Sequence, residues 1–267
     1  MNLQTPLSKV WLRAAAGVGK SFLCAYAIQQ IAVINPTAFS IFQYYSFDND
    51  FKALGVYRCL AEQLVDQLWT QLEDMPEDIH AHTQRSSASY KLEDVKALIR
   101  MLLDRRSATY IFLDGLDEQC DSNQQRIELS EVLNFLSELA TDGSRCVRLW
   151  CSSQERAYLK STLSNFSVIE VNKEQIYDDI KLHLSKRILE LDRLELDKGY
   201  QNLILSDLSE KADGCFLWAS LMLGWISKAA TLDTVQELIR EGLPSDYEKY
   251  YEKKIESIDA SQRALVS

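Results

Sequence analysis

Short apolar runs alternate along the chain with longer segments in which apolar residues recur every three or four positions. Runs rich in aromatic and β-branched residues are typical of buried strands, and the longer periodic segments are typical of amphipathic helices. Five strands are expected, at Lys9–Arg13, Ala38–Tyr45, Thr109–Leu113, Cys146–Cys151 and Ser167–Val171. Because helical segments separate them, the strands are expected to form one parallel α/β sheet with helices on both faces.

Helical periodicity fills the intervals between these strands. Helices are expected over Ser21–Ile34, Leu54–Trp69 and Leu92–Leu103, and over a segment whose apolar face carries Leu129, Val132, Leu133, Leu136 and Leu139. The polar segment Glu73–Tyr90, which contains Pro76, is expected to be an exposed loop.

After Val171 the strand signals stop and only helical periodicity remains. Apolar residues recur at every fourth position over Ile176–Ile188, and further helices are expected at Leu203–Ala212, Phe216–Ser227 and Thr231–Glu241. Gly214 stands where a helix commonly ends in a left-handed residue. The pattern predicts an α/β domain over residues 1–171, a helical subdomain over 172–250 and a linker over 251–267.

Composition limits the kinds of partner that are expected. The 267 residues include 46% hydrophobic and 25% charged residues, which is enough apolar material for a sizeable core. The formal net charge is −10, so a basic nucleic-acid-binding surface is missing and no nucleic-acid partner is expected. The longest apolar run, Cys215–Ile226, has 12 residues and is too short for a membrane span.

Six cysteines are spread along the chain, and no two have CxxC spacing. Several lie in apolar runs, so reduced thiols are expected, with a zinc site or a disulfide framework as the lesser alternative. Residues 1–10 are polar and lack a signal-peptide pattern. These features predict a cytoplasmic protein. The first strand starts close to residue 1, and no stop signal precedes residue 267, so a segment of a longer protein is expected.

The strongest chemical feature is the turn between the first expected strand and the first expected helix. It reads Ala14-Ala15-Ala16-Gly17-Val18-Gly19-Lys20-Ser21 and fits the Walker A pattern, with alanine in place of its first glycine. Gly17 and Gly19 would let backbone N–H groups wrap phosphates, and the Lys20 ammonium would contact the β- and γ-phosphates. The Ser21 hydroxyl suits Mg²⁺, and the helix dipole favours the phosphates. A chance glycine turn is the alternative, but the strand before it and the helix after it favour a nucleotide site.

Ala14 is the departure from the usual Walker A motif. If this position needs a positive φ, an alanine there would be strained and nucleotide affinity would suffer. The sequence leaves this effect open.

A second feature follows the strand at Thr109–Leu113, where the chain continues Asp114-Gly115-Leu116-Asp117-Glu118. An apolar strand that ends in a carboxylate is the Walker B arrangement, in which Asp114 would hold Mg²⁺ directly or through water. Asp117 and Glu118 offer a base for the attacking water, and Asp117 is expected slightly ahead of Glu118. The alternative is that these acids only solvate the end of a strand.

The strand at Cys146–Cys151 leads into the polar stretch Ser152-Ser153-Gln154-Glu155-Arg156. In a P-loop sheet of the ASCE type, the strand beside Walker B ends in a polar sensor of the γ-phosphate. Gln154 or Ser153 is expected in this role, with Arg156 as an alternative of longer reach. A polar loop that only caps the next helix explains the stretch equally well.

Taken together, these motifs resemble the NACHT domains of STAND ATPases, in particular the fungal NLR-like type with a nephrocystin-like N-terminal NTPase module. The resemblance covers nearly the whole chain. Lys211–Leu223 (KADGCFLWASLML) is similar to the signature of the helical subdomain that closes over the nucleotide. Glu237–Ile258 (ELIREGLPSDYEKYYEKKIESI) resembles the lead into a winged-helix domain.

The resemblance implies a five-stranded P-loop NTPase domain that binds ATP or ADP with Mg²⁺, and it implies that Phe216 contacts the base. It also implies a slow ATPase that signals: ADP holds a closed monomer, and exchange for ATP lets the protein open and oligomerise. Effector and sensor regions would lie outside this segment, with roles in non-self recognition or programmed cell death. Many relatives have arginine in place of Gln154, so the chain departs from the family there.

Two other functions stay open at this point. The chain is alternatively an ordinary hydrolytic ATPase in which turnover itself is the output. It is also compatible with a degenerate scaffold that binds nucleotide poorly and acts through protein contacts. Multiple-turnover kinetics separate a switch from a motor, and a nucleotide titration separates both from a scaffold.

Overall fold

The computed structural model describes residues 8–45, 52–70, 76–77, 79, 91–105, 108–118, 122–143, 146–190, 198–229 and 231–241. The expected linker over 251–267 lies outside these residues, and so does most of the expected loop at Glu73–Tyr90. Contacts between residues divide the chain into two compact units. The first contains residues 1–16 and 20–171, and the second contains Gly17–Gly19 and the residues from Asn172 onward.

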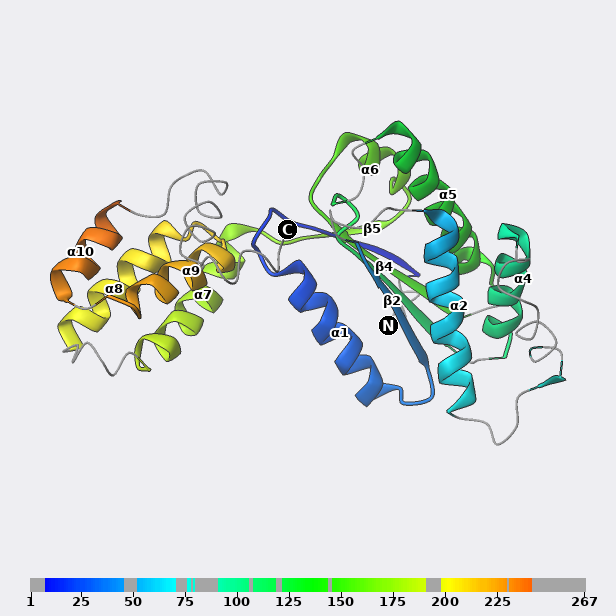
Figure 1. Cartoon of the computed structure of the whole chain (residues 1–267), viewed down its shortest axis with the longest axis horizontal. Helices are drawn as coiled ribbons and strands as arrows, with labels where there is room; N and C mark the ends of the chain where they lie inside the picture. Colours follow the sequence, from blue (N-terminus) through cyan, green and yellow to red (C-terminus); the bar gives the residue numbers. More distant parts are fainter. Residues whose placement is uncertain are drawn as a thin grey trace, which may run out of the picture. The chain divides into compact units, whose positions relative to one another are not determined.

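Five parallel strands form the centre of the first unit (Figure 1). They are β1 (Lys9–Arg13), β2 (Phe39–Tyr44), β3 (Thr109–Asp114), β4 (Val147–Ser153) and β5 (Ser167–Glu170). Their order in the sheet is β2-β3-β4-β1-β5, and each neighbouring pair is parallel. The predicted α/β sheet is therefore confirmed, and the strand ends differ from the predicted ones by at most two residues.

The register brings the carboxyl ends of three strands together. Asp114 at the end of β3 is paired with Ser152 in β4, and Arg13 at the end of β1 is paired with Ser153. Because parallel strands point the same way, the segments that follow β1, β3 and β4 all leave the sheet at one edge. Ligand sites of open α/β sheets lie outside this carboxyl edge.

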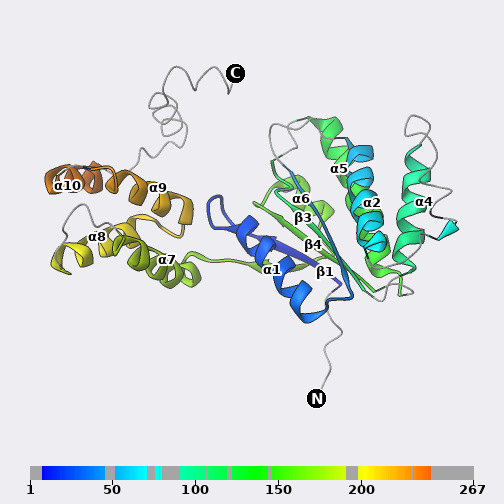
Figure 2. The same cartoon turned by 60° about the horizontal axis from the view of Figure 1, so that its bottom comes forward.

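Helices cover both faces of the sheet (Figures 1 and 2). One face carries α1 (Lys20–Ile34), and the other carries α2 (Ala53–Trp69), α4 (Leu92–Leu103) and α5 (Asn123–Thr141). Apolar side chains that recur along α2, α4 and α5 are buried in one core cluster together with residues of the strands, as the periodicity predicts. This close-packed layer fixes the strands and thereby the positions of their carboxyl ends.

One short helix in the described part of the first unit had no predicted bounds. α6 (Ala157–Thr162) follows β4 and has six residues, with Arg156 at its N-cap. Six residues are fewer than two helical turns, so no apolar repeat could reveal the helix in the sequence.

Four helices form the described part of the second unit: α7 (Lys173–Ile188), α8 (Lys198–Lys211), α9 (Phe216–Ile226) and α10 (Leu232–Glu241). Its buried apolar side chains include Ile180, Leu184, Leu208, Met222 and Val235. α8 begins at Lys198 instead of Leu203, because its first turn is polar and lacks an apolar repeat. Gly214 has a φ of +81°, which confirms the predicted left-handed residue after α8. Within the described residues, the helices are too short or too polar to span a bilayer.

Candidate functional site

The turn between β1 and α1 has the backbone of a phosphate-binding loop. Gly17 and Gly19 have φ angles of +73° and +98°, in a region that residues with a Cβ rarely adopt. A Cβ built on Gly19 would meet no atom within 4 Å, so the space beside this backbone is open. Such a backbone allows successive N–H groups to turn toward one anion.

Ala14 lacks the conformation that would strain an alanine. In the described part of the chain, Asp213 is the one non-glycine residue with a positive φ, so Ala14 lies outside the left-handed region. The Ala14 N–H donates to the carbonyl of Ser153 at 3.3 Å and extends the pairing of β1 with β4 by one residue. The strain that a positive φ would cause is therefore absent, because Ala14 continues the strand.

Lys20 begins α1, and its side chain folds back over the loop. Its Nζ donates to the carbonyl oxygen of Ala15 at 2.9 Å and to that of Ala14 at 3.3 Å. Burial lowers the pKa of Lys20, and the acids at and just after the end of β3 oppose this shift. Because phosphate oxygens are charged acceptors, they can replace the two carbonyl oxygens as partners of the ammonium group.

Asp114 is held at the end of β3 by bonds to β4. Asp114 is only 3% exposed, and Ser152 Oγ donates to its Oδ1. The N–H groups of Gly115 and Leu116 both donate to the Ser152 carbonyl, at 3.1 and 3.2 Å. Ser152 had no role in the sequence-based prediction, because only the pairing of β3 with β4 places it beside Asp114.

Asp117 and Glu118 lie in different surroundings. Asp117 Oδ1 accepts a hydrogen bond from the Gln154 N–H at 2.9 Å. The Glu118 carboxylate makes no hydrogen bond or ion pair with a described residue, and its carboxyl carbon lies 3.4 Å from a Cβ built on Gly115. Burial raises the pKa of Glu118, the two neighbouring aspartates raise it further, and the Lys20 ammonium lowers it.

The three candidates for a γ-phosphate sensor, at the end of β4 and just after it, differ in their surroundings. Ser153 is fully buried, and its hydroxyl oxygen accepts a hydrogen bond from Trp11 Nε1 at 2.8 Å, which directs this side chain toward β1. Gln154 is half-buried and is the first residue beyond β4. Arg156 is exposed and stands at the N-cap of α6. Gln154 stays the predicted sensor.

The donor set fits Mg²⁺ together with a nucleoside triphosphate. Ser21 is exposed in the first turn of α1, and Asp114 ends β3. No group of three or more His, Cys, Asp and Glu side chains within the described ranges could hold a metal. Mg²⁺ usually takes only one or two protein ligands and completes its shell with water and phosphate oxygens. The oxygens of Ser21 and Asp114 suit that requirement.

Phe216, which was predicted to contact the base, is the first residue of α9. It is half-buried, and its ring meets the His183 ring edge-on with centroids 6.0 Å apart. The next residue, Leu217, donates its N–H to the carbonyl of Gly17 at 3.2 Å, and both belong to the second unit. A contact of Phe216 with a base stays a prediction.

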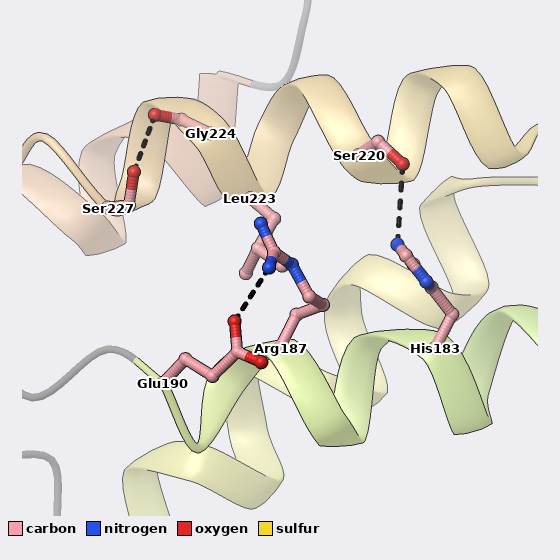
Figure 3. A pocket seen from close by; sticks show the side chains of 7 residues that line it. All are labelled: His183, Arg187, Glu190, Ser220, Leu223, Gly224 and Ser227. Atoms are coloured by element: carbon pink, nitrogen blue, oxygen red, sulfur yellow. Dashed lines mark hydrogen bonds and ion pairs between the residues drawn. The ribbon is translucent and has the colours of Figure 1, made fainter.

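A separate pocket of about 420 Å³ lies between α7 and α9 (Figure 3). Its lining consists of His183, Arg187, Glu190, Ser220, Leu223, Gly224 and Ser227. The His183 ring points toward Ser220 Oγ at 3.4 Å, and Arg187 is paired with Glu190 at 2.7 Å. None of the residues predicted for nucleotide or Mg²⁺ is among them, and His183 connects the pocket to Phe216 through the contact of their rings.

The comparison with known proteins agrees with the fold. Residues 3–154, more than half of the chain, match the family described as Nephrocystin 3, N-terminal. No curated protein matches the chain. The ORC2 protein of Aeropyrum pernix, solved as ADPNP-ADP complexes, is similar with a TM-score of 0.57 and 14% identity, over 94% of this chain and 65% of that one. PCH-2 of C. elegans is similar with a TM-score of 0.50 and 15% identity, over 87% of this chain and 59% of that one.

The chain spans less than two thirds of the length of these two proteins, and at such identities the likeness concerns the fold alone. That fold is the α/β fold of P-loop ATPases, as predicted. The resemblance to a nephrocystin-like NTPase module is confirmed by the family match over residues 3–154. The chain belongs to the Nephrocystin 3, N-terminal family.

Proposed function

We propose that this chain is an ATP- and ADP-binding switch of the STAND class, of the NACHT and fungal NLR-like kind, in which slow hydrolysis gates oligomerisation and signalling. The observation that carries the proposal is the placement of Lys20. Its ammonium lies at the start of α1, beside two glycines with positive φ and within the field of the acids that follow β3. This arrangement provides an anion cradle and a cation site side by side.

Each residue of the site has a task in the proposed reaction. The backbone of residues 14–21 and the Lys20 ammonium bind the phosphates, and Ser21 and Asp114 hold Mg²⁺. The metal, when bound, neutralises charge on the phosphate oxygens. Glu118 accepts the proton of the attacking water, because its carboxylate is not engaged by a described residue and burial raises its pKa. This order reverses the sequence-based preference for Asp117.

Three further observations support the switch. The similar ORC2 structure was solved with ADPNP and ADP, which supports nucleotide as the ligand of this fold. The bond from Leu217 to Gly17 supports a role for α9, and for Phe216 at its start, in sensing the nucleotide. The resemblance to NACHT proteins supports signalling in non-self recognition or cell death. We extend the proposal to a cytoplasmic protein that forms homo-oligomers with ATP, with effector and sensor regions outside this segment.

The test is to identify the nucleotide retained by the purified protein and then to measure multiple-turnover hydrolysis. The switch predicts retained ADP and very slow turnover, and Lys20→Ala protein should retain none. Rapid turnover without a trigger would instead support an ordinary hydrolytic ATPase. If the purified protein retains no nucleotide and also binds none that is added, the chain is a scaffold and the proposal is wrong.

A further inference from the structure

We infer that Asp117 is a positioning residue, which fixes the backbone of Gln154 beside the turn after β3, and that it is not the base. The inference rests on the proposed function, because it assigns a task inside the same site. It gives different tasks to two adjacent acids that the sequence offers as alternative bases, with a slight preference for Asp117.

The first observation is the contact itself. Asp117 Oδ1 accepts the Gln154 N–H at 2.9 Å across 37 residues of chain. Gln154 is the first residue after β4, so the strand pairing that ends at Ser153 no longer fixes its backbone. The Asp117 carboxylate is therefore the group that fixes the backbone one residue beyond the end of the strand pairing, at the predicted γ-phosphate sensor.

The second observation is that the following residue is held independently. Glu155 pairs with Arg13 at the end of β1 and with Lys160 in α6, the latter at 3.2 Å. The loop after β4 is thus held from the β3 side by Asp117 and from the β1 side by Arg13. Loss of the Asp117 bond should release Gln154 while Glu155 and the fold stay in place.

The third observation is the contrast with Glu118. Its carboxylate makes no hydrogen bond or ion pair with a described residue and lies over Gly115. A base must have a lone pair free to take a proton from water, and a carboxylate oxygen that already accepts a backbone N–H is less basic. Glu118 meets this requirement better than Asp117.

The two roles predict different effects of substitution at position 117. Asparagine keeps an oxygen that can accept the Gln154 N–H but cannot act as a base, whereas alanine removes both properties. If Asp117 only positions Gln154, Asp117→Asn should hydrolyse ATP at close to the wild-type rate. Asp117→Ala should be slower by about 10- to 100-fold, the order expected when a contact to the reacting group is misplaced by about 1 Å.

The first measurement does not depend on hydrolysis. Amide hydrogen exchange at Gln154 should be slow in the wild-type chain and in Asp117→Asn, and clearly faster in Asp117→Ala. The amides of Leu113 and Leu149, inside β3 and β4, should remain protected in all three proteins, which shows that the fold is retained. Unchanged exchange at Gln154 in Asp117→Ala would overturn the inference.

The second measurement compares single-turnover ATP hydrolysis by the same three proteins and by Glu118→Gln. Retained activity in Asp117→Asn with loss in Asp117→Ala supports positioning. Equal loss in both variants would show that the charge at position 117 is needed and would overturn the inference. If the wild-type chain neither binds nor hydrolyses ATP, the proposed function fails, and the exchange result alone decides whether Asp117 orders Gln154.

Discussion

The two halves of the candidate site are held in different ways. At the ends of β3 and β4, groups from distant parts of the chain bond to one another: the buried Ser152 to the buried Asp114, and the partly buried Asp117 to Gln154. In the loop between β1 and α1, the charged side chain bonds within its own segment, because Lys20 donates to two carbonyls of that loop.

This difference suits the two parts to different tasks, catalysis at the strand ends and phosphate binding in the loop. In the proposed function, the strand ends would provide fixed positions for a metal and a water molecule, which catalysis needs before the substrate arrives. The loop provides a cation and glycines whose partners can change when phosphates bind. Loss of an acid at the strand ends should therefore affect the rate or the metal-dependent binding, and loss of a bond between the strand ends should affect stability. Loss of the Lys20 ammonium should instead affect binding and leave stability nearly unchanged.

The largest effect should come from Glu118→Gln, which tests whether one acid near the ends of β3 and β4 acts in the reaction without supporting the fold. The rate of ATP hydrolysis should fall by about 10²- to 10⁴-fold, while ATP affinity and the free energy of unfolding stay unchanged. In the wild-type chain the rate should fall as the pH drops through the pKa of Glu118. Because that pKa is raised, the fall should begin at a higher pH than for an exposed glutamate. An unchanged rate in the variant would show that Glu118 is not the base.

Asp114→Asn should weaken ATP binding only when Mg²⁺ is present. The neutral amide is a poorer metal ligand, so affinity for ATP·Mg²⁺ should fall by about 10- to 100-fold, as expected for one lost charged contact. ATP titrations of the wild type and the variant, once with Mg²⁺ and once with a chelator, measure the affinities. The two proteins should have equal ATP affinity in the chelator. A similar loss under both conditions would mean that Asp114 supports the fold of the site and does not hold the metal.

Ser152→Ala should reduce stability, because it removes the donor to a buried carboxylate. A loss of about 1–3 kcal/mol in the free energy of unfolding is expected. Urea denaturation measures it, and Ser161→Ala is the matched control. Ser161 is exposed and bonds only to a carbonyl of its own helix, so its loss should change stability by less than about 0.5 kcal/mol. Equal effects in both variants would contradict the buried link between β3 and β4.

The smallest effect should come from Ala14→Gly in the loop half. Ala14 has no positive φ, so glycine relieves no strain there and only adds freedom to the unfolded chain. Stability should fall by about 0.4–1 kcal/mol, and nucleotide affinity should not change. Thermal unfolding and a titration with ATP·Mg²⁺ measure the two quantities. A clear rise in affinity would show that alanine does impair this loop.

The fold could be predicted from the sequence because its signals are local. Apolar runs mark the strands, helical repeats mark most helices, and Gly17, Gly19 and Lys20 lie together in one turn. α6 escaped prediction because six residues are too few for a repeat. The predicted start of α8 was wrong because the first turn of this helix is polar.

The links within the site could not be predicted in the same way. The bond between Asp117 and Gln154 joins residues 37 positions apart, and it depends on β3 and β4 being neighbours in a particular register. The same register gives Ser152 its contact with Asp114 and places Ser153 beside β1, where its hydroxyl bonds to Trp11. The effect of Ala14 depended on a backbone angle, which residue identity alone does not determine.

The most direct test of the account is a calorimetric titration of the chain and of Lys20→Ala with ATP·Mg²⁺. Lys186→Ala, which removes an exposed lysine in α7, serves as the charge-matched control. Wild type and control should bind one equivalent of nucleotide with equal affinity. Lys20→Ala should bind about 100-fold more weakly or not measurably, since each lost bond from a charged donor is worth about 1.5–3 kcal/mol. Its unfolding midpoint should not change. Equal affinity of Lys20→Ala and wild type would contradict the assignment of this loop as the nucleotide site.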